Sequence, residues 1–315
     1  MVVVNSNIIQ LILLFSAVII GSVFGIFQIQ IASEFILDIA IIALVFSVFL
    51  QIPLKNFISL NKIVSYKKYI SIAWMLNFIF IPTIAFVLAL LFFDRESAIF
   101  LGILIYLIAP CTDWVLGFTK KCEGDEVANS LLLPINLFSQ IILLPIYLLL
   151  FVGVETFPQV DILFETLIIW IIFPLFLAQF CRFIINKYSK NNSLIDKYSP
   201  IMMDISLIIL IIQIFSLNIE VLLEYSSSIP LILLVIFIFF IVIYYLVKMI
   251  SKFFKLSQNL EKSLTMTTAA RNAPLMFAVS LVLFPEMVLI HSVIIIGMLL
   301  EFPHLILLSH ILSED

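Results

Sequence analysis

The hydrophobic and polar positions of this chain alternate over the length of whole helices rather than residue by residue. Apolar runs of about 17–25 residues, long enough to cross a bilayer as an α-helix, are separated by short polar segments. Ten such runs occur, at residues 8–27, 35–54, 69–93, 97–120, 126–153, 160–185, 200–219, 229–250, 262–284 and 286–311. The pattern predicts an all-α polytopic membrane protein with ten transmembrane helices, whose short loops leave no room for a soluble domain.

Composition points to the same class. Of the 315 residues, 64% are hydrophobic and 11% are charged, and the mean hydropathy is +1.27. A soluble domain is about half apolar and about a quarter charged. The N-terminus lacks the basic residues of a signal peptide, so we expect the first apolar run to be retained as a helix.

The basic residues predict an orientation. Fourteen of the 16 Lys and Arg residues fall on one predicted side: Lys55, Lys62, Lys67, Lys68, Lys120, Lys121, Arg182, Lys187, Lys190, Lys197, Lys248, Lys252, Lys255 and Lys262. The opposite loops carry Glu34, Asp94, Glu96, Glu155, Asp161, Glu220, Glu224 and Glu286, with Arg95 as their only base. The positive-inside rule then places both termini in the cytoplasm, in a multi-pass protein that we expect in the plasma membrane.

Ten spans divide into two units of five, residues 1–153 and 160–311. When an odd number of helices is repeated in tandem, the second unit is inverted relative to the first, as in many secondary transporters. Two spans are interrupted at matching places, one at Ala109–Cys111 and the other at Arg271–Pro274. Such paired interruptions indicate a binding site, because unwound backbone at that depth must be buried in protein or line a wet cavity.

Cys111 is the first candidate for chemistry. Pro110 splits the helix, and we expect the next half-helix to present its N-terminus, with Cys111 and Thr112, to a ligand. A buried cysteine usually acts as a small hydrophobe, but a thiol at a helix N-terminus gains thiolate character and then favours soft, thiophilic species. Cys122 is about 16 Å further along an intact helix. With Cys181, the three cysteines show neither a disulfide framework nor metal-ligand spacing.

Three ionisable residues within spans are candidates for proton coupling: Asp113, Arg271 and Glu301. Asp113 and Arg271 lie one in each interruption, so they are expected to pair, since an isolated charge at the bilayer centre costs about 2.5–3.5 kcal/mol. That pair is either structural or opened by a proton; alternatively, Arg271 binds an anionic substrate. Glu301 has no neighbouring base in the sequence, so we expect it to load and release a proton; the alternative is a side chain that snorkels near a helix end.

Several amide side chains also lie within spans. Asn77, Asn136 and Gln140 have interhelical hydrogen bonding as their default role and cavity lining as the alternative. Asn272 belongs to the second interruption. We include Asn77, Asn136 and Asn272 with Pro110, Cys111 and Thr112 among the expected substrate-binding residues.

These residues carry a resemblance. "LNFIFIP" (with Asn77), "APCT" at 109–112, "INLFSQ" (with Asn136) and "LLEFP" (with Glu301) are similar to the arsenical-resistance-3, or arsenite efflux, family of the bile acid/arsenite/riboflavin transporter superfamily. The resemblance covers nearly the whole chain. It implies a panel domain of helices 1, 2, 6 and 7, and a core domain of helices 3–5 and 8–10 in which helices 4 and 9 cross. It also implies that Cys111 carries arsenite and that Glu301 exchanges protons.

The chain departs from these relatives at both interruptions. Asp113 and Trp114 stand where arsenite carriers have an apolar pair. At the second interruption those carriers have a motif that contains a glutamate, whereas this chain has "RNAPL", so the glutamate is missing and an arginine is added. Val115, Leu116 and Thr267 stand about where the bile-acid branch holds sodium. A cation at Arg271 would repel sodium, so we expect a proton as the coupling ion and place the chain in a divergent branch.

The sequence therefore favours a proton-coupled exporter of arsenite or antimonite, with protons, a small inorganic oxyacid and lipid as its partners. Neither a cofactor nor a nucleic-acid partner is expected. The alternative is an organic-anion carrier of the same fold that uses Arg271 as its anion site. An intramembrane enzyme is disfavoured because the chain has no HExxH, no GxSxG and no pair of aspartates set for protease chemistry.

Overall fold

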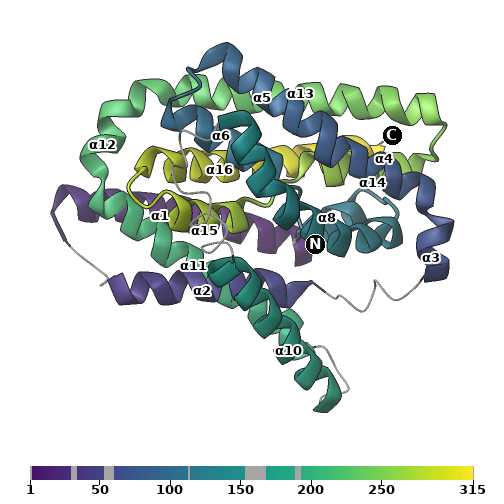
Figure 1. Cartoon of the computed structure of the whole chain (residues 1–315), viewed down its shortest axis with the longest axis horizontal. Coiled ribbons are helices and arrows are strands. Elements are labelled where there is room, and N and C mark those ends of the chain that lie inside the picture. Colours follow the sequence, from purple (N-terminus) through teal and green to yellow (C-terminus); the bar gives the residue numbers. More distant parts are fainter. Residues whose placement is uncertain are drawn as a thin grey trace.

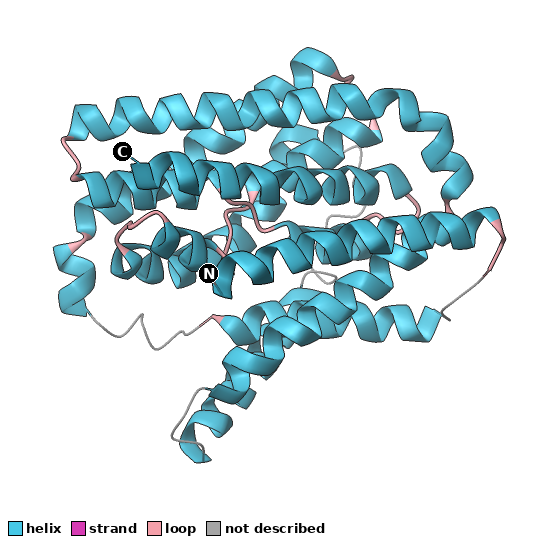
Figure 2. Cartoon of the chain, turned by 180° about the vertical axis from the view of Figure 1, so that it is seen from behind, coloured by secondary structure: helices cyan, strands magenta, loops and turns pink. Residues whose placement is uncertain are grey.

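The computed structural model describes residues 2–29, 34–52, 60–112, 114–152, 168–188 and 193–314. Within these ranges the chain forms helices joined by short loops, and no strand longer than a single bridge (Figure 2). Most helices run along the long axis of the molecule, while α10 projects from the body (Figure 1).

The helices follow one another with few long connections. The first half contains α1 (Val2–Ile26), α2 (Glu34–Gln51), α3 (Leu60–Ser65), α4 (Lys67–Met75), the π-helix η2 (Leu76–Phe80), α5 (Ile81–Phe92), α6 (Ala98–Ile108), α7 (Val115–Lys121), α8 (Glu126–Tyr147) and the π-helix η3 (Leu148–Val152). The second half contains the π-helix η5 (Ile168–Ile172), α10 (Phe173–Tyr188), α11 (Ser193–Leu217), α12 (Ile219–Glu224), the 3-10 helix η6 (Tyr225–Ser228), α13 (Ile229–Phe254), α14 (Gln258–Ala269), α15 (Ala273–Leu283) and α16 (Val288–Glu314).

Seven helices in the described part of the chain are long and apolar enough to cross a membrane. The segments Phe35–Gln51, Ala98–Ile108 and Ala273–Leu283 are apolar but shorter. The last two belong to the expected interrupted spans, in which each half-helix crosses only part of the bilayer. A multi-pass membrane protein is confirmed, whereas the count of ten spans and the inverted repeat stay predictions.

Two groups of helices pack mainly within themselves. In one group α2 and α11 make the most extensive contact, and α1 and α10 join them. In the other, α6 packs on α16 and α5, α13 packs on α14, and α4 packs on α8. The groups meet chiefly where α15 lies against α2 and α16 lies against α1. The described helices thus divide into two packed groups with a smaller contact between them.

Short polar signals set several helix ends. The Ser97 side chain accepts a hydrogen bond from the Phe100 backbone N–H and caps α6. Asp125 does the same for α8 through the N–H of Ala128. After α13 the chain turns at Lys255, whose left-handed backbone (φ 51°) ends the helix. These residues set where α6 and α8 begin and where α13 ends.

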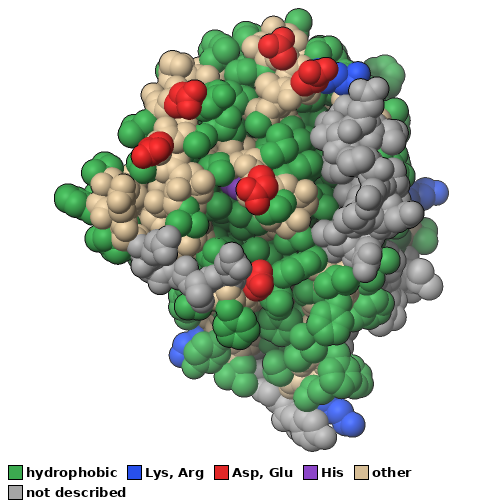
Figure 3. All heavy atoms as spheres, turned by 60° about the vertical axis from the view of Figure 1, so that its left-hand side comes forward, with side chains coloured by type: hydrophobic (Ala, Val, Ile, Leu, Met, Phe, Trp, Pro, Cys, Tyr) green, Lys and Arg blue, Asp and Glu red, His purple; other side chains and the backbone are tan. Residues whose placement is uncertain are grey.

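Exposed charges differ between the two ends of the molecule. Acidic side chains gather on the face shown in Figure 3, and we call this face the acidic end. Of the acidic residues in the loops and helix ends, these are exposed: Asp38, Asp94, Glu96, Glu220, Glu224 and Glu286. The basic end contains the start of α4 and the α13–α14 turn, where the Lys68 ammonium donates to the Phe254 carbonyl at 2.6 Å. The C-terminus also lies at the basic end (Figure 1).

Candidate functional site

The two interrupted helices cross through their unwound segments. α6 ends at Ile108 and α7 begins at Val115, while α14 ends at Ala269 and α15 begins at Ala273. Pro110 and Arg271 form an antiparallel β-bridge between the gaps. The Cys111 N–H donates to the Ala270 carbonyl at 3.1 Å, and the Asn272 N–H donates to the Ala109 carbonyl at 2.9 Å. Each gap thus satisfies backbone groups of the other, which unwound chain in the middle of a membrane requires.

The Arg271 side chain is fully buried and turns toward helix ends rather than toward an open site. Its Nη1 donates to the Leu107 carbonyl at 3.0 Å, and its Nη2 donates to the carbonyls of Thr267, at 3.3 Å, and Thr268. These carbonyls belong to the last turns of α6 and α14, which have no partners within their own helices. The guanidinium therefore caps two half-helices at once.

Glu301, on α16, connects both interruptions from one side. Its Oε1 accepts from the Arg271 backbone N–H at 2.9 Å and from Trp114 Nε1 at 3.1 Å. Its Oε2 accepts from the Tyr106 hydroxyl at 3.1 Å. The carboxyl is fully buried. Three hydrogen bonds hold this buried carboxyl in place. Because their donors come from both interrupted helices, a change in the protonation of Glu301 would change hydrogen bonds to both of them.

Amide side chains gather on the other elements of the crossing. Asn272 Nδ2 donates to Thr112 Oγ1 at 3.0 Å and to Gln140 Oε1 at 3.4 Å. Asn136 lies one turn before Gln140 on α8 and therefore on the same face. All four side chains are buried. Asn272 Oδ1, Gln140 Nε2 and both polar atoms of Asn136 have no hydrogen-bond partner among the described residues.

Asn77 lies in the π-helix η2, and both of its polar side-chain atoms also lack a partner in the described structure. Pro82 follows and lacks the N–H that would bond the Phe78 carbonyl; the Tyr147 hydroxyl donates to that carbonyl instead, at 2.5 Å. Together with the Trp74–Ser139 hydrogen bond of 2.9 Å, this contact places η2 against α8. No hydrogen bond joins Asn77 to the crossing itself within the described part of the chain.

The cysteines differ from the sequence expectation in one respect. Cys111 was expected at the opening of the half-helix, but α7 begins only at Val115, so Cys111 lies in the extended crossing segment. The reason is that Ala109–Cys111 must stay extended to pair with residues 270–272. The Cys111 side chain is fully buried. Cys122, beyond α7, is also buried, and burial raises the pKa of its thiol.

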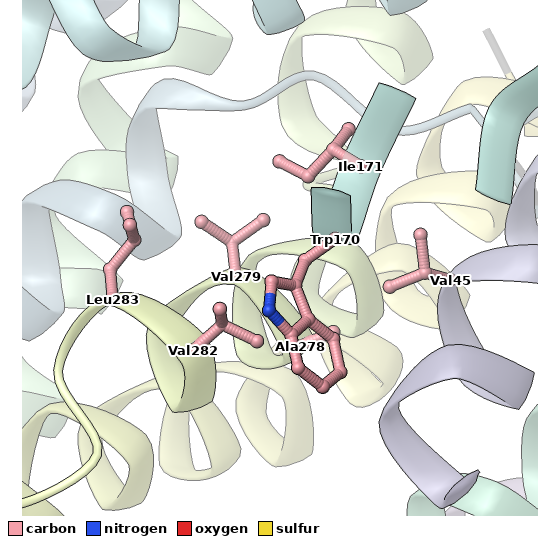
Figure 4. Close-up of a pocket in the computed structure, with 7 residues that line it drawn as sticks. All are labelled: Val45, Trp170, Ile171, Ala278, Val279, Val282 and Leu283. Carbon is pink, nitrogen blue, oxygen red and sulfur yellow. The ribbon is translucent and has the colours of Figure 1, made fainter. Parts of the chain in front are cut away.

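A small apolar cavity lies at the boundary between the two helix groups. Val45 of α2 and Trp170 of η5 face α15 along Ala278–Leu283, and the cavity between them is only about 10 Å³ (Figure 4). That is barely enough for one water molecule. Toward the acidic end, a wider cavity of about 470 Å³ is lined partly by Asp38, Gln213, Asn218 and Glu286. None of the residues that line these two cavities belongs to the crossing itself.

The structure brings together most of the residues singled out from the sequence. Hydrogen bonds connect Pro110's segment, Thr112, Arg271, Asn272 and Glu301. Asp113 lies outside the described residues, so the expected Asp113–Arg271 pair stays a prediction. Sequence reasoning missed Tyr106 and Trp114 as partners of Glu301, because an aromatic residue in an apolar span gives no signal of its own.

Comparison with known proteins gives one match. The model of the "Sodium Bile acid symporter family" matches residues 38–225, which is more than half of the chain. Curated protein sequences gave no significant match. The matched region includes the first interruption and the amide residues of α8, and it ends before the second interruption.

Proposed function

The chain belongs to the sodium bile acid symporter family, whose members are membrane transporters, and we propose that this member exports arsenite or antimonite in exchange for protons. Both termini would face the cytoplasm of the plasma membrane. The substrate would be held at the helix crossing by Cys111, with Pro110 and Thr112 beside it and the amides of Asn272, Asn136 and Asn77 around it.

The observation that carries the proposal is the set of buried amide atoms without partners among the described residues. Gln140 Nε2 and Asn136 Nδ2 supply donors, while Asn136 Oδ1 and Asn272 Oδ1 supply acceptors, and all are uncharged. An unsatisfied buried polar group costs about 1–3 kcal/mol, so such a cluster favours a polar ligand. Trivalent arsenic hydroxide is neutral at cell pH, and each of its hydroxyls both donates and accepts hydrogen bonds.

Cys111 supplies the selectivity for arsenic. A thiolate is a soft ligand that prefers thiophilic species over oxygen compounds of the same shape. Exchange of one arsenic hydroxyl for the Cys111 sulfur forms one As–S bond, breaks one As–O bond and releases water as the thiol proton joins the hydroxyl. A single sulfur gives a reversible bond, which suits a carrier that must release its substrate.

Glu301 is the proposed proton carrier. As an ion it accepts three hydrogen bonds, from Arg271 N–H, Trp114 and Tyr106. A protonated carboxyl accepts fewer and donates one, so proton binding would loosen the contacts that hold both crossing segments. This links protonation to the arrangement of the crossing, as a ligand with different affinities for two states shifts their populations.

Proton exchange can drive useful export. One charge moving through the membrane potential is worth about 2.3 kcal/mol per 100 mV. A drive of about 150 mV would therefore hold a gradient of a neutral solute on the order of 300-fold. The substrate would reach the opposite side of the membrane as the two helix groups move relative to each other.

The competing function is transport of an organic anion gripped by Arg271. It is less well supported, because three Arg271 contacts are with backbone carbonyls and the side chain is fully buried. Replacement of Cys111 separates the two functions, since an anion carrier would keep its activity without that sulfur.

The test is arsenite uptake into everted membrane vesicles with an imposed pH gradient. The native chain should accumulate arsenite, an uncoupler should abolish the accumulation, and Cys111→Ser should lose it. Cys122→Ser is the matched control and should transport like the native chain. Uptake equal to that of vesicles without the protein, or undiminished uptake by Cys111→Ser, would refute the proposal.

A further inference from the structure

The guanidinium of Arg271 lies among backbone carbonyl oxygens that are arranged like the ligands of a cation site. The carbonyls of Leu107, Thr267 and Thr268 converge on its guanidinium from two different half-helices. The Phe239 ring lies 5.9 Å from the guanidinium carbon and covers it from α13. The side chain is therefore enclosed by carbonyl oxygen and an aromatic face, both of which attract cations.

Electrostatics explain why a positive charge is needed there. A helix C-terminus carries about half a negative charge on its unpaired carbonyls, and α6 and α14 end within reach of one side chain. Water cannot solvate such groups at the centre of a membrane. In transporters with interrupted helices, converging C-terminal carbonyls of this kind coordinate a coupling cation such as Na⁺.

We infer that Arg271 is a tethered cation that fills a monovalent-cation site at the helix crossing. The guanidinium keeps its charge throughout the physiological pH range and cannot dissociate from the chain. The guanidinium therefore always neutralises the partial negative charge at the C-terminal ends of α6 and α14. Neither folding nor transport then requires a bound alkali ion. This inference relies on the proposed function only in taking the crossing as the transport site.

The remaining groups around Arg271 fit this role. Its Nε has no partner in the described structure, so the carbonyl contacts use only the outer nitrogens. Glu301 binds the Arg271 backbone N–H rather than the guanidinium. The fixed positive charge and the proposed proton-carrying carboxyl thus make separate contacts, and one can be removed without deleting the other's hydrogen bonds.

The test is thermal unfolding of the purified protein in choline, sodium, lithium and potassium chloride at equal ionic strength, and with added millimolar guanidinium chloride. The native chain should melt at the same temperature in all four salts. Arg271→Ala should melt lower, and one small cation or guanidinium should raise its melting temperature saturably by about 3 °C or more. Arg95→Ala is the control, because Arg95 also donates to backbone carbonyls but is exposed; it should respond like the native chain.

Two results would overturn the inference: saturable stabilisation of the native chain by Na⁺, or a folded Arg271→Ala variant that melts alike in every salt. If Arg271→Ala does not fold, Arg271→Lys and Arg271→Met decide the matter. The lysine keeps the charge and should be the more stable of the two, whereas equal stability would mean that only volume matters. None of these measurements uses arsenic, so the outcome is independent of whether the protein transports it.

Discussion

Pro110 and Arg271 lie opposite each other in an antiparallel β-bridge where two interrupted helices cross. The crossing separates two kinds of surroundings. The Arg271 side chain neutralises the C-terminal ends of α6 and α14. Asn272, the next residue, hydrogen-bonds with Thr112 and Gln140. The charged guanidinium of Arg271 and the uncharged polar cluster around Asn272 therefore have separate hydrogen-bond partners, although the two residues are neighbours in the chain.

Asn136→Leu should reduce transport without reducing stability. Both polar atoms of the Asn136 side chain are buried and have no partner within the described residues. Removing such groups should raise the free energy of unfolding by as much as about 1–3 kcal/mol, while taking donors and an acceptor from the site. Thermal unfolding and arsenite uptake measure the two effects.

Asn129→Leu is the matched control for that change. Asn129 accepts from the Tyr69 hydroxyl at 2.6 Å and donates to Thr119 at 2.7 Å and to the Ser263 carbonyl at 3.0 Å. Its replacement should lower stability. If Asn136→Leu is destabilised as much as Asn129→Leu, then Asn136 is a structural residue and not part of a ligand site.

Glu301→Gln should uncouple arsenite uptake from the pH gradient. The amide keeps the shape of the carboxyl but cannot carry the exchanged proton, and its contacts lose charge assistance worth about 1.5–3 kcal/mol. Gradient-driven uptake should fall by about tenfold or more, as measured in everted vesicles. Glu224→Gln, at an exposed position outside the site, should behave like the native chain. Equal uptake by Glu301→Gln and the native chain would show that Glu301 does not couple protons.

Gly297→Ala tests how Glu301 is positioned. A Cβ atom at Gly297 would lie 2.6 Å from the Tyr106 ring. The single hydroxyl hydrogen of Tyr106 is shared between the Gly297 carbonyl, at 3.0 Å, and Glu301 Oε2, at 3.1 Å. The added methyl should lower the free energy of unfolding by about 1–3 kcal/mol. In a Tyr106→Leu background the penalty should shrink, and an equal penalty in both backgrounds would place the strain elsewhere.

Cys122 should react slowly with a membrane-permeant maleimide. Burial raises the pKa of its thiol, and only the thiolate attacks, so the reactive fraction is small at neutral pH. In single-cysteine chains Cys122 should react about tenfold more slowly than the partly exposed Cys181, with a rate still increasing at about pH 9. A Cys122 rate equal to that of Cys181 at pH 7 would mean that Cys122 is accessible, and it would then compete with Cys111 for arsenic.

The sequence predicted the interruptions because prolines and polar residues stand out in apolar spans. Pro110 and Pro274 marked both gaps, and the structure places them at one crossing. The sequence did not predict where the helix resumes after Pro110, because the extended segment is set by pairing with residues 270–272, which are distant in the chain.

The partners of the charged residues were harder to predict. The hydrogen bonds that Arg271 makes within the described residues go to backbone carbonyls, which every residue carries and no sequence pattern marks. The expected pair with Asp113 stays a prediction, because Asp113 lies outside those residues. Tyr106 and Trp114 were overlooked for a related reason, since aromatic residues are common in membrane spans and only their positions in space bring them to Glu301.

Arsenic X-ray absorption on the purified protein tests the central claim most directly. The sample is a chain with Cys122→Ser and Cys181→Ser, so that Cys111 is the only thiol, loaded with trivalent arsenic at one equivalent. We expect a bound arsenic with one sulfur and two oxygen neighbours, and no bound arsenic once Cys111→Ser is added. Arsenic surrounded by oxygen alone, or a spectrum unchanged by Cys111→Ser, would contradict the account.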